Sequence, residues 1–545
     1  MDSVDQPRAV DGRAPDVFRR DGWLPMRCYA DTDEVDFAIV GTGAGGGTLT
    51  CKLASAGFRV VAFEAGPFWR PLEDFASDEK AQRQLYWYDE RISSGADPIQ
   101  LGSNNSGRGV GGSTVHFTML TPRYRPEWFK SRSLLGYAVD WPFGWDDIEP
   151  YYDEVEQMLQ VAGPLSYPWG RRRSRYPRRA HELNASAIVL ARGCEGMGIQ
   201  WSPAPIATLS SPRGPAPPCT YRGFCVAGCS TNAKQSVLVT WIPRAVESGA
   251  EIRDRAMVGR IEIDGNRATG VHYYRQGQWR FQAARQVVVA GYCIETPRLL
   301  LNSACPECPE GVANRNGLVG KYLMVHANDG VYGEVDDEVR WYKAPPSLAL
   351  TEHWNYTDSG KHFYGGYLVA NQGPLVRDWS IKLALSTGLW GTALRQEMTR
   401  YNHMAGVKMV GEIEPSARNS VEVTTETDQL GLPIPKVTFS YSANDRELIA
   451  HARGFMRQML EAVGARNIWM EADTAHLLGG CRMGTNREDS VTDGYGRTWD
   501  IPNLWICDGS LFPTSGGANP SLTIMAVACR IGDHMADLAR HGQLH

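Results

Sequence analysis

The sequence lacks any long hydrophobic run. No window approaches the roughly 18 to 20 apolar residues that a membrane-spanning helix requires. Even the apolar stretch SLTIMAVACRIG at 521–532 is short and interrupted. The N-terminal stretch, MDSVDQPRAVDGRAP, contains no apolar segment of the kind found in export signals. We therefore expect no direct membrane span and no export signal in this stretch itself.

Cysteine and excess charge are also scarce. Twelve cysteines in 545 residues exclude a disulfide scaffold, and the CxxC pair Cys305 and Cys308 has no second pair with which to bind a metal. That pair fits a loop or an occasional disulfide better. A formal net charge of -5 with 21% charged residues is typical of an ordinary globular protein, so we expect no nucleic-acid partner. The basic run 171–179 fits a solvated surface loop or a protein contact.

Glycine, by contrast, occurs in an informative pattern. Residues 36–66 predict a strand, a glycine turn, a helix and a second strand. Gly41, Gly43 and Gly46 form GxGxxG, which lets the backbone approach a pyrophosphate at a helix N-terminus. Glu64 ends the second strand about 20 residues later, where its carboxylate can accept hydrogen bonds from ribose hydroxyls. This unit predicts a dinucleotide site without separating NAD from FAD.

The remaining chain is long enough for at least two domains. A glycine-rich segment at 97–122 is typical of backbone laid against a flat ligand. Residues 251–290 predict short strands that lead into a helix at ETPRLLL. From 326 to 443 longer alternating strands precede a helix at 444–463, which indicates a second, antiparallel domain.

Four motifs occur in an order that resembles a known family. They are the N-terminal GxGxxG, GRGVGGSTVHF, the helix start GYCIETPRLL, and the closing segments HLLGGCRMG and CDGSLFPTSGGANPSLT. Together they resemble the glucose-methanol-choline (GMC) family of FAD-dependent alcohol oxidoreductases, over about residues 36–540. The resemblance implies a mixed α/β and α+β fold, with a Rossmann-like FAD-binding domain built from separate segments and an antiparallel substrate domain.

The same resemblance implies a division of the chain. We expect an N-terminal extension at 1–35, FAD-binding segments within 36–325 that include a cysteine loop at 217–236, and a substrate-binding domain at 326–470. The segment 471–545 would return to the FAD-binding domain and carry the catalytic residues.

The family motifs also imply individual site residues. His476, in HLLGGCRMG, takes the position of the catalytic base, and Asn519, in GGANPSLT, that of the second polar catalytic residue. A neutral imidazole suits removal of a hydroxyl proton, whereas an amide can hold the substrate oxygen. Taken singly, each would be a structural histidine or a helix cap. The residues expected to contact the cofactor are Gly41, Gly43, Gly46, Glu64, Gly111, Gly112, Ser113, His116, Val258, Asp508, Gly509 and Asn519. For His116 we favour noncovalent contact with FAD over covalent attachment.

Three cysteines lie close together in CTYRGFCVAGC, at Cys219, Cys225 and Cys229. Their spacing alone leaves open a free-thiol loop, one disulfide with a spare thiol, or zinc with a distant ligand. The loop resembles that of bacterial FAD-dependent sugar dehydrogenases, which bind a [3Fe-4S] cluster through three cysteines. The resemblance implies the same cluster here, a small partner subunit with a twin-arginine signal, a cytochrome c acceptor and a periplasmic location. A cytoplasmic location remains the alternative.

The expected reaction is oxidation of a secondary alcohol of a sugar or glycoside to a ketone, with C3 of glucosides favoured by the resemblance to glucoside 3-dehydrogenases. One alternative is an oxygen-using GMC oxidase without a cluster, and another is a noncatalytic flavin electron-transfer subunit. Several aromatic residues could stack on sugar faces, although core packing explains each of them better. They are Trp341, Tyr342, Trp354, Tyr364 and Trp390.

Overall fold

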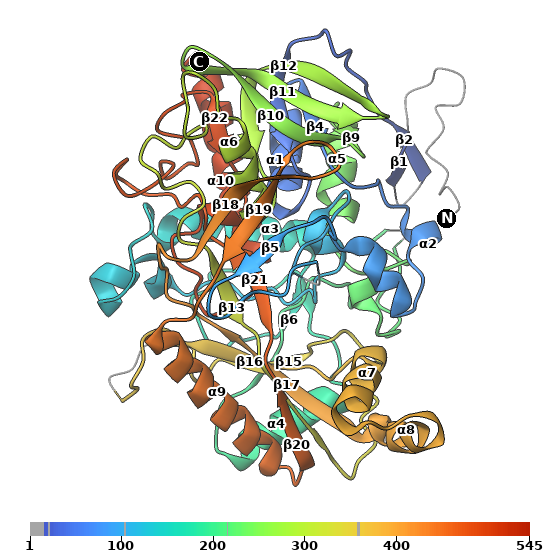
Figure 1. Ribbon diagram of the computed structural model, residues 1–545. Coiled ribbons are helices and arrows are strands. Elements are labelled where there is room, and N and C mark those ends of the chain that lie inside the picture. Colours follow the sequence, from blue (N-terminus) through green and yellow to red (C-terminus); the bar gives the residue numbers. More distant parts are fainter. Residues whose placement is uncertain (1–15, 20–21, 103–104, 215, 357–359, 545) are drawn as a thin grey trace.

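The computed structural model describes residues 16–19, 22–102, 105–214, 216–356 and 360–544. Part of the predicted extension, residues 1–15, therefore lies outside the described residues. The first described residues form a short antiparallel hairpin of β1 (Asp16–Arg19) and β2 (Gly22–Pro25). Two large sheets dominate the molecule, one near the top and one near the bottom of Figure 1.

The upper sheet has seven strands and contains the predicted βαβ unit. Its strands are β3 (Val35–Val40), β4 (Val60–Phe63), β9 (Glu251–Arg253), β10 (Met257–Asp264), β11 (Arg267–Arg275), β12 (Gln278–Val289) and β22 (Leu504–Ile506). β4 is buried along its whole length, as a parallel strand covered on both faces should be. The expected strand, turn, helix and strand at 36–66 are confirmed, since α1 (Ala44–Ser55) connects β3 to β4.

One long strand joins two parts of this sheet. The first half of β12 pairs antiparallel with β11, and its second half pairs parallel with β3 and β22. β12 leads into α6 (Tyr292–Asn302), at the place where the sequence predicted a helix. Strands distant in sequence thereby end at one edge of the sheet, which is where α/β folds bind ligands.

The lower sheet has eight strands, paired antiparallel. They are β8 (Ser202–Pro203), β13 (Met324–Ala327), β14 (Gly330–Glu334), β15 (Ala349–Thr351), β16 (Tyr367–Asn371), β17 (Met404–Gly411), β20 (Arg466–Glu471) and β21 (Thr474–Leu478). The predicted antiparallel domain corresponds to most of this sheet. Yet β8 comes from the range 36–325 and β21 from the range 471–545, so the segments interleave more than the predicted ranges indicate.

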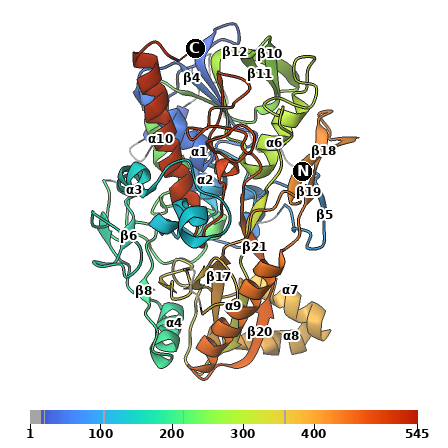
Figure 2. The ribbon, with the colours of Figure 1, turned by 90° about the vertical axis from the view of Figure 1, so that its left-hand side faces the viewer.

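Helices cover both sheets. The others are α2 (Pro71–Asp74), α3 (Trp145–Leu159), α4 (Ala185–Gly196), α5 (Trp241–Glu247), α7 (Val376–Thr387), α8 (Gly391–Met398), α9 (Ala443–Glu461) and α10 (Ser521–Arg540). α10 packs on α1 and α3 along one side of the upper part, and α9 packs with α4 against the lower sheet (Figure 2). Ser442 caps the start of α9, because its hydroxyl accepts a hydrogen bond from the Asp445 amide, and this agrees with the predicted helix at 444–463. α7 and α8 were not predicted.

Smaller elements complete the structure. β5 (Ile92–Ser94), β18 (Ser420–Thr427) and β19 (Pro433–Thr438) form a three-stranded sheet, and β6 (Ala162–Gly163) pairs with β7 (Arg178–Arg179). Among the described helices, none combines the length and apolarity needed to cross a lipid bilayer.

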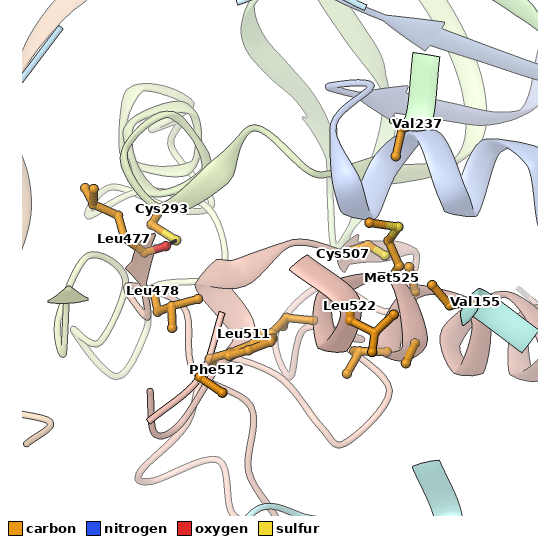
Figure 3. Close-up of a cluster of buried hydrophobic side chains, with 14 of the residues drawn as sticks. Val155, Val237, Cys293, Leu477, Leu478, Cys507, Leu511, Phe512, Leu522 and Met525 are labelled. Carbon is orange, nitrogen blue, oxygen red and sulfur yellow. Dashed lines mark hydrogen bonds between the residues drawn. The ribbon is translucent and has the colours of Figure 1, made fainter. Parts of the chain in front are cut away.

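Apolar packing joins the C-terminal segments to both sheets. Figure 3 shows Leu478 of β21 near Leu511, and it draws Leu477 of β21 with Leu522 and Met525 of α10 in the same buried cluster. All five side chains are buried. This packing holds β21 and the start of α10 in fixed positions. His476 lies on β21, and Asn519 lies just before α10.

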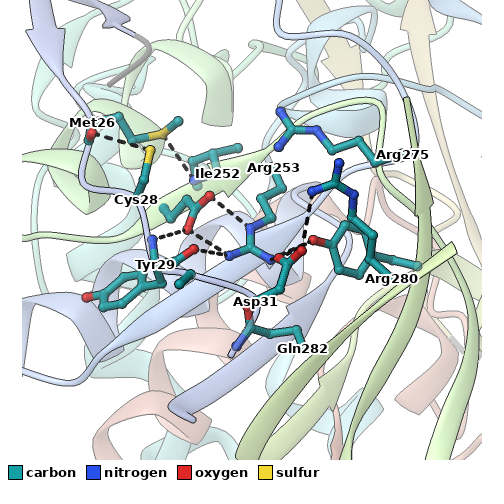
Figure 4. Close-up of polar contacts among 12 residues, drawn as sticks. Met26, Cys28, Tyr29, Asp31, Ile252, Arg253, Arg275, Arg280 and Gln282 are labelled. Atoms are coloured by element: carbon teal, nitrogen blue, oxygen red, sulfur yellow. Dashed lines mark hydrogen bonds and ion pairs between the residues drawn. The ribbon is translucent and has the colours of Figure 1, made fainter. Parts of the chain in front are cut away.

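A charged network around Arg253 links β9 and β11 of the upper sheet with the segment at Tyr29 and Asp31 (Figure 4). Arg253 donates to both carboxylate oxygens of Glu251, at 2.8 and 3.1 Å, and to the Tyr29 carbonyl at 2.7 Å. It also donates to Asp31 at 3.0 Å and to the Tyr273 hydroxyl at 2.9 Å. These bonds attach the segment after the N-terminal hairpin to β9 and β11.

Candidate active site

The two predicted catalytic side chains meet at one wall of a large cavity. His476 Nε2 lies 3.3 Å from Asn519 Nδ2, although the residues are 43 positions apart. His476 comes from β21 of the lower sheet, and Asn519 lies just before α10. Both line the cavity. The structure thus brings together two residues that the sequence placed in separate motifs.

His476 is partly buried, and its imidazole is electrically neutral. Burial, and secondly the neighbouring His326, lowers the pKa of the His476 imidazole well below its usual value. Its backbone has φ of +53°, a left-handed conformation that is uncommon for residues other than glycine and costs about 1 kcal/mol or more. Such local strain is tolerated where the surrounding structure imposes it.

Asn519 has an unused acceptor. Its Oδ1 is buried and has no hydrogen-bond partner among the residues that the structure describes, while its Nδ2 faces His476. A buried amide oxygen without a partner is costly unless a ligand or water supplies the missing donor. The vacant acceptor therefore points to a hydroxyl-bearing molecule in the cavity.

The predicted glycine turn lines the same cavity. Gly41 and Gly43 both line it, and Gly41 has φ of +98°. A Cβ on Gly41 would lie 2.3 Å from the Ala290 carbonyl oxygen, so only glycine fits there. Gly46 does not line the cavity. A Cβ on it would lie 2.0 Å from the Gly41 carbonyl oxygen, so this glycine allows the helix to start close to the turn.

Glu64 lies at the edge of the same cavity. Its Oε2 accepts from the Thr42 amide at 3.2 Å and the Thr42 hydroxyl at 2.8 Å. Its Oε1 accepts from the amides of Gly66 at 3.1 Å and Gly109 at 3.0 Å. Burial raises the pKa of this carboxyl, and the four donors oppose that effect. A ribose hydroxyl would have to share or replace one of these bonds.

The glycine-rich segment approaches the βαβ turn closely. Gly112, Ser113 and His116 line the cavity, and a Cβ on Gly112 would lie 2.7 Å from the Gly43 Cα. Gly111 does not line it but makes the close turn beneath, with φ of +95°. Burial, and secondly Lys234, lowers the pKa of His116 to about 3.

Several buried polar atoms in the cavity have no hydrogen-bond partner among the described residues. Besides Asn519 Oδ1, neither Trp87 Nε1 nor His116 Nε2 has a hydrogen-bond partner within the described part of the chain. Together with the glycine turn, these atoms fit a large polar aromatic cofactor such as FAD, which would supply both donors and acceptors. Noncovalent contact between FAD and His116 stays a prediction.

The remaining predicted cofactor residues also line the cavity. They are Val258 of β10, Asp508 and Gly509. Asp508 accepts from the Ser510 amide at 2.8 Å, the Tyr292 amide at 2.8 Å and the Thr296 hydroxyl at 2.5 Å. These bonds fasten the turn after β22 to the start of α6.

The cavity lining also includes polar residues that the sequence motifs missed. Asn328, Gln372 and Lys408, all from the lower sheet or its edges, line the cavity together with Trp341. Lys408 forms an ion pair with Asp473 at 2.8 Å. No motif marks these residues, because they come together only through the pairing of β14, β16 and β17. Of the five aromatic residues that could stack on a sugar, only Trp341 lines the cavity, and Trp390 is 83% exposed.

The cysteine loop borders the cavity without forming a single-ion site. Gly223 and Val226 of the loop line the cavity. Among the described residues, no group of three or more His, Cys, Asp or Glu side chains is placed to hold a metal ion. The three thiols nevertheless interact electrostatically. Burial, together with charge on Cys219 and Cys229, raises the pKa of Cys225 to about 12. The predicted [3Fe-4S] cluster stays a prediction.

The family models match most of the chain. A GMC oxidoreductase N-terminal model covers residues 44–328 and a GMC oxidoreductase C-terminal model covers 415–528. Pyridoxine 4-oxidase from Mesorbium loti superposes with a TM-score of 0.65 at 17% identity, over 92% of this chain and 99% of the other. That likeness confirms the predicted fold class.

Curated relatives span nearly the full length of the chain. A 2-methyl-1,2-propanediol dehydrogenase from Mycolicibacterium austroafricanum is 32% identical, covering 92% of this chain and 95% of the relative. The fructose dehydrogenase large subunit of Gluconobacter japonicus is 28% identical over 94% and 99% of the two chains. A 6'''-hydroxyparomomycin C oxidase from Streptomyces lividus is 30% identical over 96% and 95%. The expectation of an enzyme is confirmed, and the reading as a noncatalytic subunit is dropped. The chain belongs to the GMC oxidoreductase family, the FAD-dependent alcohol oxidoreductases that its motifs resemble.

Proposed function

We propose that this enzyme is an FAD-dependent dehydrogenase that oxidises a secondary alcohol of a sugar or glycoside to a ketone. The observation that carries the proposal is the pair of His476 Nε2 and Asn519 Nδ2, 3.3 Å apart on the wall of a cavity that also contains the GxGxxG turn. The pair can hold one hydroxyl group between a base and an amide.

The chemistry follows from the state of the two side chains. His476 is neutral at physiological pH, so its imidazole can take the proton as the substrate O–H bond breaks. Asn519 donates from Nδ2 to the substrate oxygen and holds it as negative charge develops there. When bound, FAD supplies a hydride acceptor at its N5 position. Burial of the site keeps water away from the developing charge.

Polar residues in the cavity lining support a polyhydroxylated substrate. Asn328 and Gln372 can each donate to and accept from sugar hydroxyls, and Lys408 adds a cationic donor. Trp341 offers an aromatic face. Among the relatives, the fructose dehydrogenase and the 6'''-hydroxyparomomycin C oxidase are named for sugar-containing compounds, whereas the 2-methyl-1,2-propanediol dehydrogenase is named for a simple diol. The choice of a sugar or glycoside therefore rests on the polar lining of the cavity. Within this class we propose C3 of glucosides as the oxidised position.

Anaerobic reduction of the bound flavin tests the reaction. The holoenzyme is mixed with D-glucose, D-fructose, methyl β-D-glucopyranoside or 2-methyl-1,2-propanediol, and flavin absorbance is followed. We expect methyl β-D-glucopyranoside to bleach the flavin fastest and to yield the 3-keto product. His476→Ala should retain FAD but slow bleaching by about 10²- to 10⁴-fold. Near-normal bleaching by that variant would remove His476 from its assigned role.

For the route out of the flavin we propose a [3Fe-4S] cluster held by Cys219, Cys225 and Cys229. A cuboidal cluster spreads its thiolates over different iron atoms, so its ligands lie further apart than those of a single ion. Two contacts suit thiolates: the Tyr221 amide lies 3.4 Å from Cys219 Sγ, and the Thr231 hydroxyl lies 3.5 Å from Cys229 Sγ. When bound, the cluster would pass electrons singly to a protein acceptor.

A buried lysine connects the cysteine loop to the flavin cavity. Lys234 Nζ donates to the carbonyls of Val115 and Cys225, both at 2.7 Å. Burial lowers the pKa of Lys234 to about 7, and thiolates at Cys225 and Cys229 would restore its charge. A cation placed between the two sites would offset the negative charge of cluster ligands.

Iron and acid-labile sulfide content, with an electron paramagnetic resonance spectrum of the oxidised protein, tests the cluster. A three-iron signal that disappears in Cys225→Ser would support it, together with a cytochrome c acceptor, a small subunit carrying a twin-arginine signal and a periplasmic location. Absence of iron and signal would reject it.

An oxygen-using oxidase is the second candidate. It is favoured by the oxidase name of one relative, which is 30% identical to this chain. Hydrogen peroxide formed in proportion to sugar consumed, in protein without iron, would establish it.

A further inference from the structure

A bulge in the lower sheet sets the direction of the His476 side chain. On the antiparallel pair β13 and β21, Met324 pairs with Leu478 and His326 pairs with Ala475. Two residues of β21 therefore oppose one residue of β13, which is the definition of a β-bulge. His476 is one of the two and adopts φ of +53°. Bulges re-aim side chains, and here the imidazole of His476 comes to face that of His326.

His326 is completely buried, and its hydrogen bonds define where its proton lies. Its Nε2 is 2.7 Å from the Gly516 carbonyl oxygen and 3.1 Å from the Ser515 carbonyl oxygen. Carbonyl oxygens only accept, so Nε2 must carry a hydrogen. Burial lowers the pKa of His326 to about 4, which keeps the ring neutral and leaves Nδ1 without a proton.

That vacant nitrogen faces the catalytic histidine. His326 Nδ1 lies 3.1 Å from His476 Nδ1, and the two rings meet nearly edge to face, at an interplanar angle of 78°. Two unprotonated nitrogens at this distance would repel each other, so His476 Nδ1 must carry the hydrogen. A neutral imidazole has a single N–H, and Nε2 of His476 is then the atom with the free lone pair.

We propose that His326 is a positioning residue that holds His476 in the tautomer whose unprotonated Nε2 faces Asn519 and the substrate. The inference rests on the proposed role of His476 as the base. In the reaction, the substrate O–H bond breaks and an N–H bond forms at His476 Nε2, while the hydrogen on Nδ1 stays hydrogen-bonded to His326. His476 thereby becomes an imidazolium. The C–H bond on the same carbon would break with its electron pair as the C=O bond forms, and FAD, when bound, would supply the hydride acceptor.

His326 is not a proton relay. Its Nε2–H ends on backbone carbonyls, which do not take up a proton at physiological pH. The proton acquired by His476 must therefore leave through the cavity. This separates the pair from histidines that are oriented by a carboxylate, where a negative charge also stabilises the imidazolium.

The backbone that His326 contacts has other anchors. The Tyr124 hydroxyl also donates to the Ser515 carbonyl, and Ser515 Oγ bonds the amide of Ile413 at 3.0 Å and its carbonyl at 3.2 Å. The segment leading to Asn519 is thus held without His326. Loss of the Nε2 contact alone should leave this segment in place.

Matched substitutions separate the two contacts of His326. An asparagine Oδ1 occupies nearly the place of histidine Nδ1 and can accept from His476, whereas a glutamine Nε2 occupies nearly the place of histidine Nε2 and can donate to the Gly516 carbonyl. We therefore compare His326→Asn, His326→Gln and His326→Leu as FAD-loaded enzymes. The readout is the limiting rate of anaerobic flavin reduction and the apparent Kd for methyl β-D-glucopyranoside.

The expected order is distinctive. His326→Asn should stay within about threefold of the unsubstituted rate, whereas His326→Gln and His326→Leu should lose about 10- to 100-fold in rate with little change in Kd, because base catalysis is impaired and substrate binding is not. Equal rates in all three variants, with His476→Ala inactive, would overturn the inference alone. Activity of His476→Ala would overturn the proposed base and this inference with it. If the Gln variant reduced the flavin faster than the Asn variant, the contact of His326 with the Gly516 carbonyl, rather than its contact with His476, would control the rate, and the inference would be wrong.

Nitrogen NMR of the holoenzyme labelled with ¹⁵N-histidine gives a readout independent of turnover. We expect His476 with a protonated Nδ1 and an unprotonated Nε2, assigned by the absence of its signals in His476→Ala. In His326→Leu the two tautomers should become mixed. A protonated Nε2 on His476 in the unsubstituted enzyme would refute the inference.

Discussion

The network around Arg253 and the cavity around His476 are both polar regions of the interior, but they differ in whether their polar atoms have hydrogen-bond partners. Arg253 is 2% exposed, and it donates hydrogen bonds to oxygen atoms of the chain. Two of these oxygen atoms belong to the Glu251 carboxylate. In the cavity, His476 and His326 are neutral, and Asn519 Oδ1 has no partner among the described residues. Buried polar groups with complete partners stabilise one fold, whereas incomplete ones mark where a ligand binds.

Among the changes that test this contrast, the largest loss of flavin-reduction rate should come from substitution of Asn519, with another buried asparagine as its control. Asn519→Ala should lower the rate of flavin reduction by about 10²- to 10³-fold, because it removes a donor to the substrate oxygen. Its melting temperature should change little, since Asn519 Oδ1 has no partner in the described structure. Stopped-flow reduction and differential scanning fluorimetry measure the two quantities.

Asn503 is the matched control. Its side chain donates to the carbonyls of Ala268 and Arg285, both at 2.7 Å, and accepts from the Ala268 amide at 2.9 Å. Asn503→Ala should therefore reduce the free energy of unfolding by about 1 to 3 kcal/mol while flavin reduction in the folded enzyme stays normal. The opposite result, a stable Asn503 variant and an unfolded Asn519 variant, would remove the contrast.

The second prediction breaks the charged network. Arg253→Met leaves the buried Glu251 carboxylate without its cation, so the free energy of unfolding should fall by about 3 to 5 kcal/mol. Urea unfolding followed by circular dichroism measures this change. The rate of flavin reduction at low temperature should be unaltered, and a slow but fully stable variant would contradict the assignment of this network to stability alone.

The third prediction concerns pH. Burial lowers the pKa of His326 to about 4, against about 6.5 in an unfolded chain. Between these values the unfolded state binds more protons than the folded state, so stability falls as pH falls from about 6.5 to about 4. The loss from this one residue should reach about 2 to 3 kcal/mol.

His326→Asn should flatten this pH dependence, which melting temperatures at pH 7.5 and pH 5 would reveal. His541→Asn, at an exposed histidine after α10, is the control and should keep the original slope. Parallel slopes for all three proteins would mean that His326 is protonated in the folded state.

The smallest effect should come from an exposed ion pair near the charged network. Arg285 pairs with Glu34 at 3.0 Å, with side chains 61% and 56% exposed. Arg285→Met should change the free energy of unfolding by no more than about 1 kcal/mol, measured in the same urea titration as Arg253→Met. A loss as large as that of Arg253→Met would show that burial is not what separates the two arginines.

Local patterns predicted much of the fold and part of the site. The glycine turn, α1, α6 and α9 all lie where the sequence indicated, because strand alternation, GxGxxG and helix capping act over a few neighbouring residues. α7 and α8 were missed inside a region predicted as strands. The interleaving of β8 and β21 into the lower sheet was also not indicated, since strand partners are chosen by burial across the whole molecule.

By itself the sequence determined the family, the dinucleotide turn and the two motifs that contain His476 and Asn519, because each of these is a short run of specific residues. Only the tertiary structure decided that the two side chains meet, that Asn328, Gln372 and Lys408 share their cavity, and that His326 faces His476. The two histidines are 150 positions apart, and their contact depends on the pairing of β13 with β21 and on a one-residue bulge. Such a contact leaves no local pattern, because its hydrogen bonds form only once distant strands have paired.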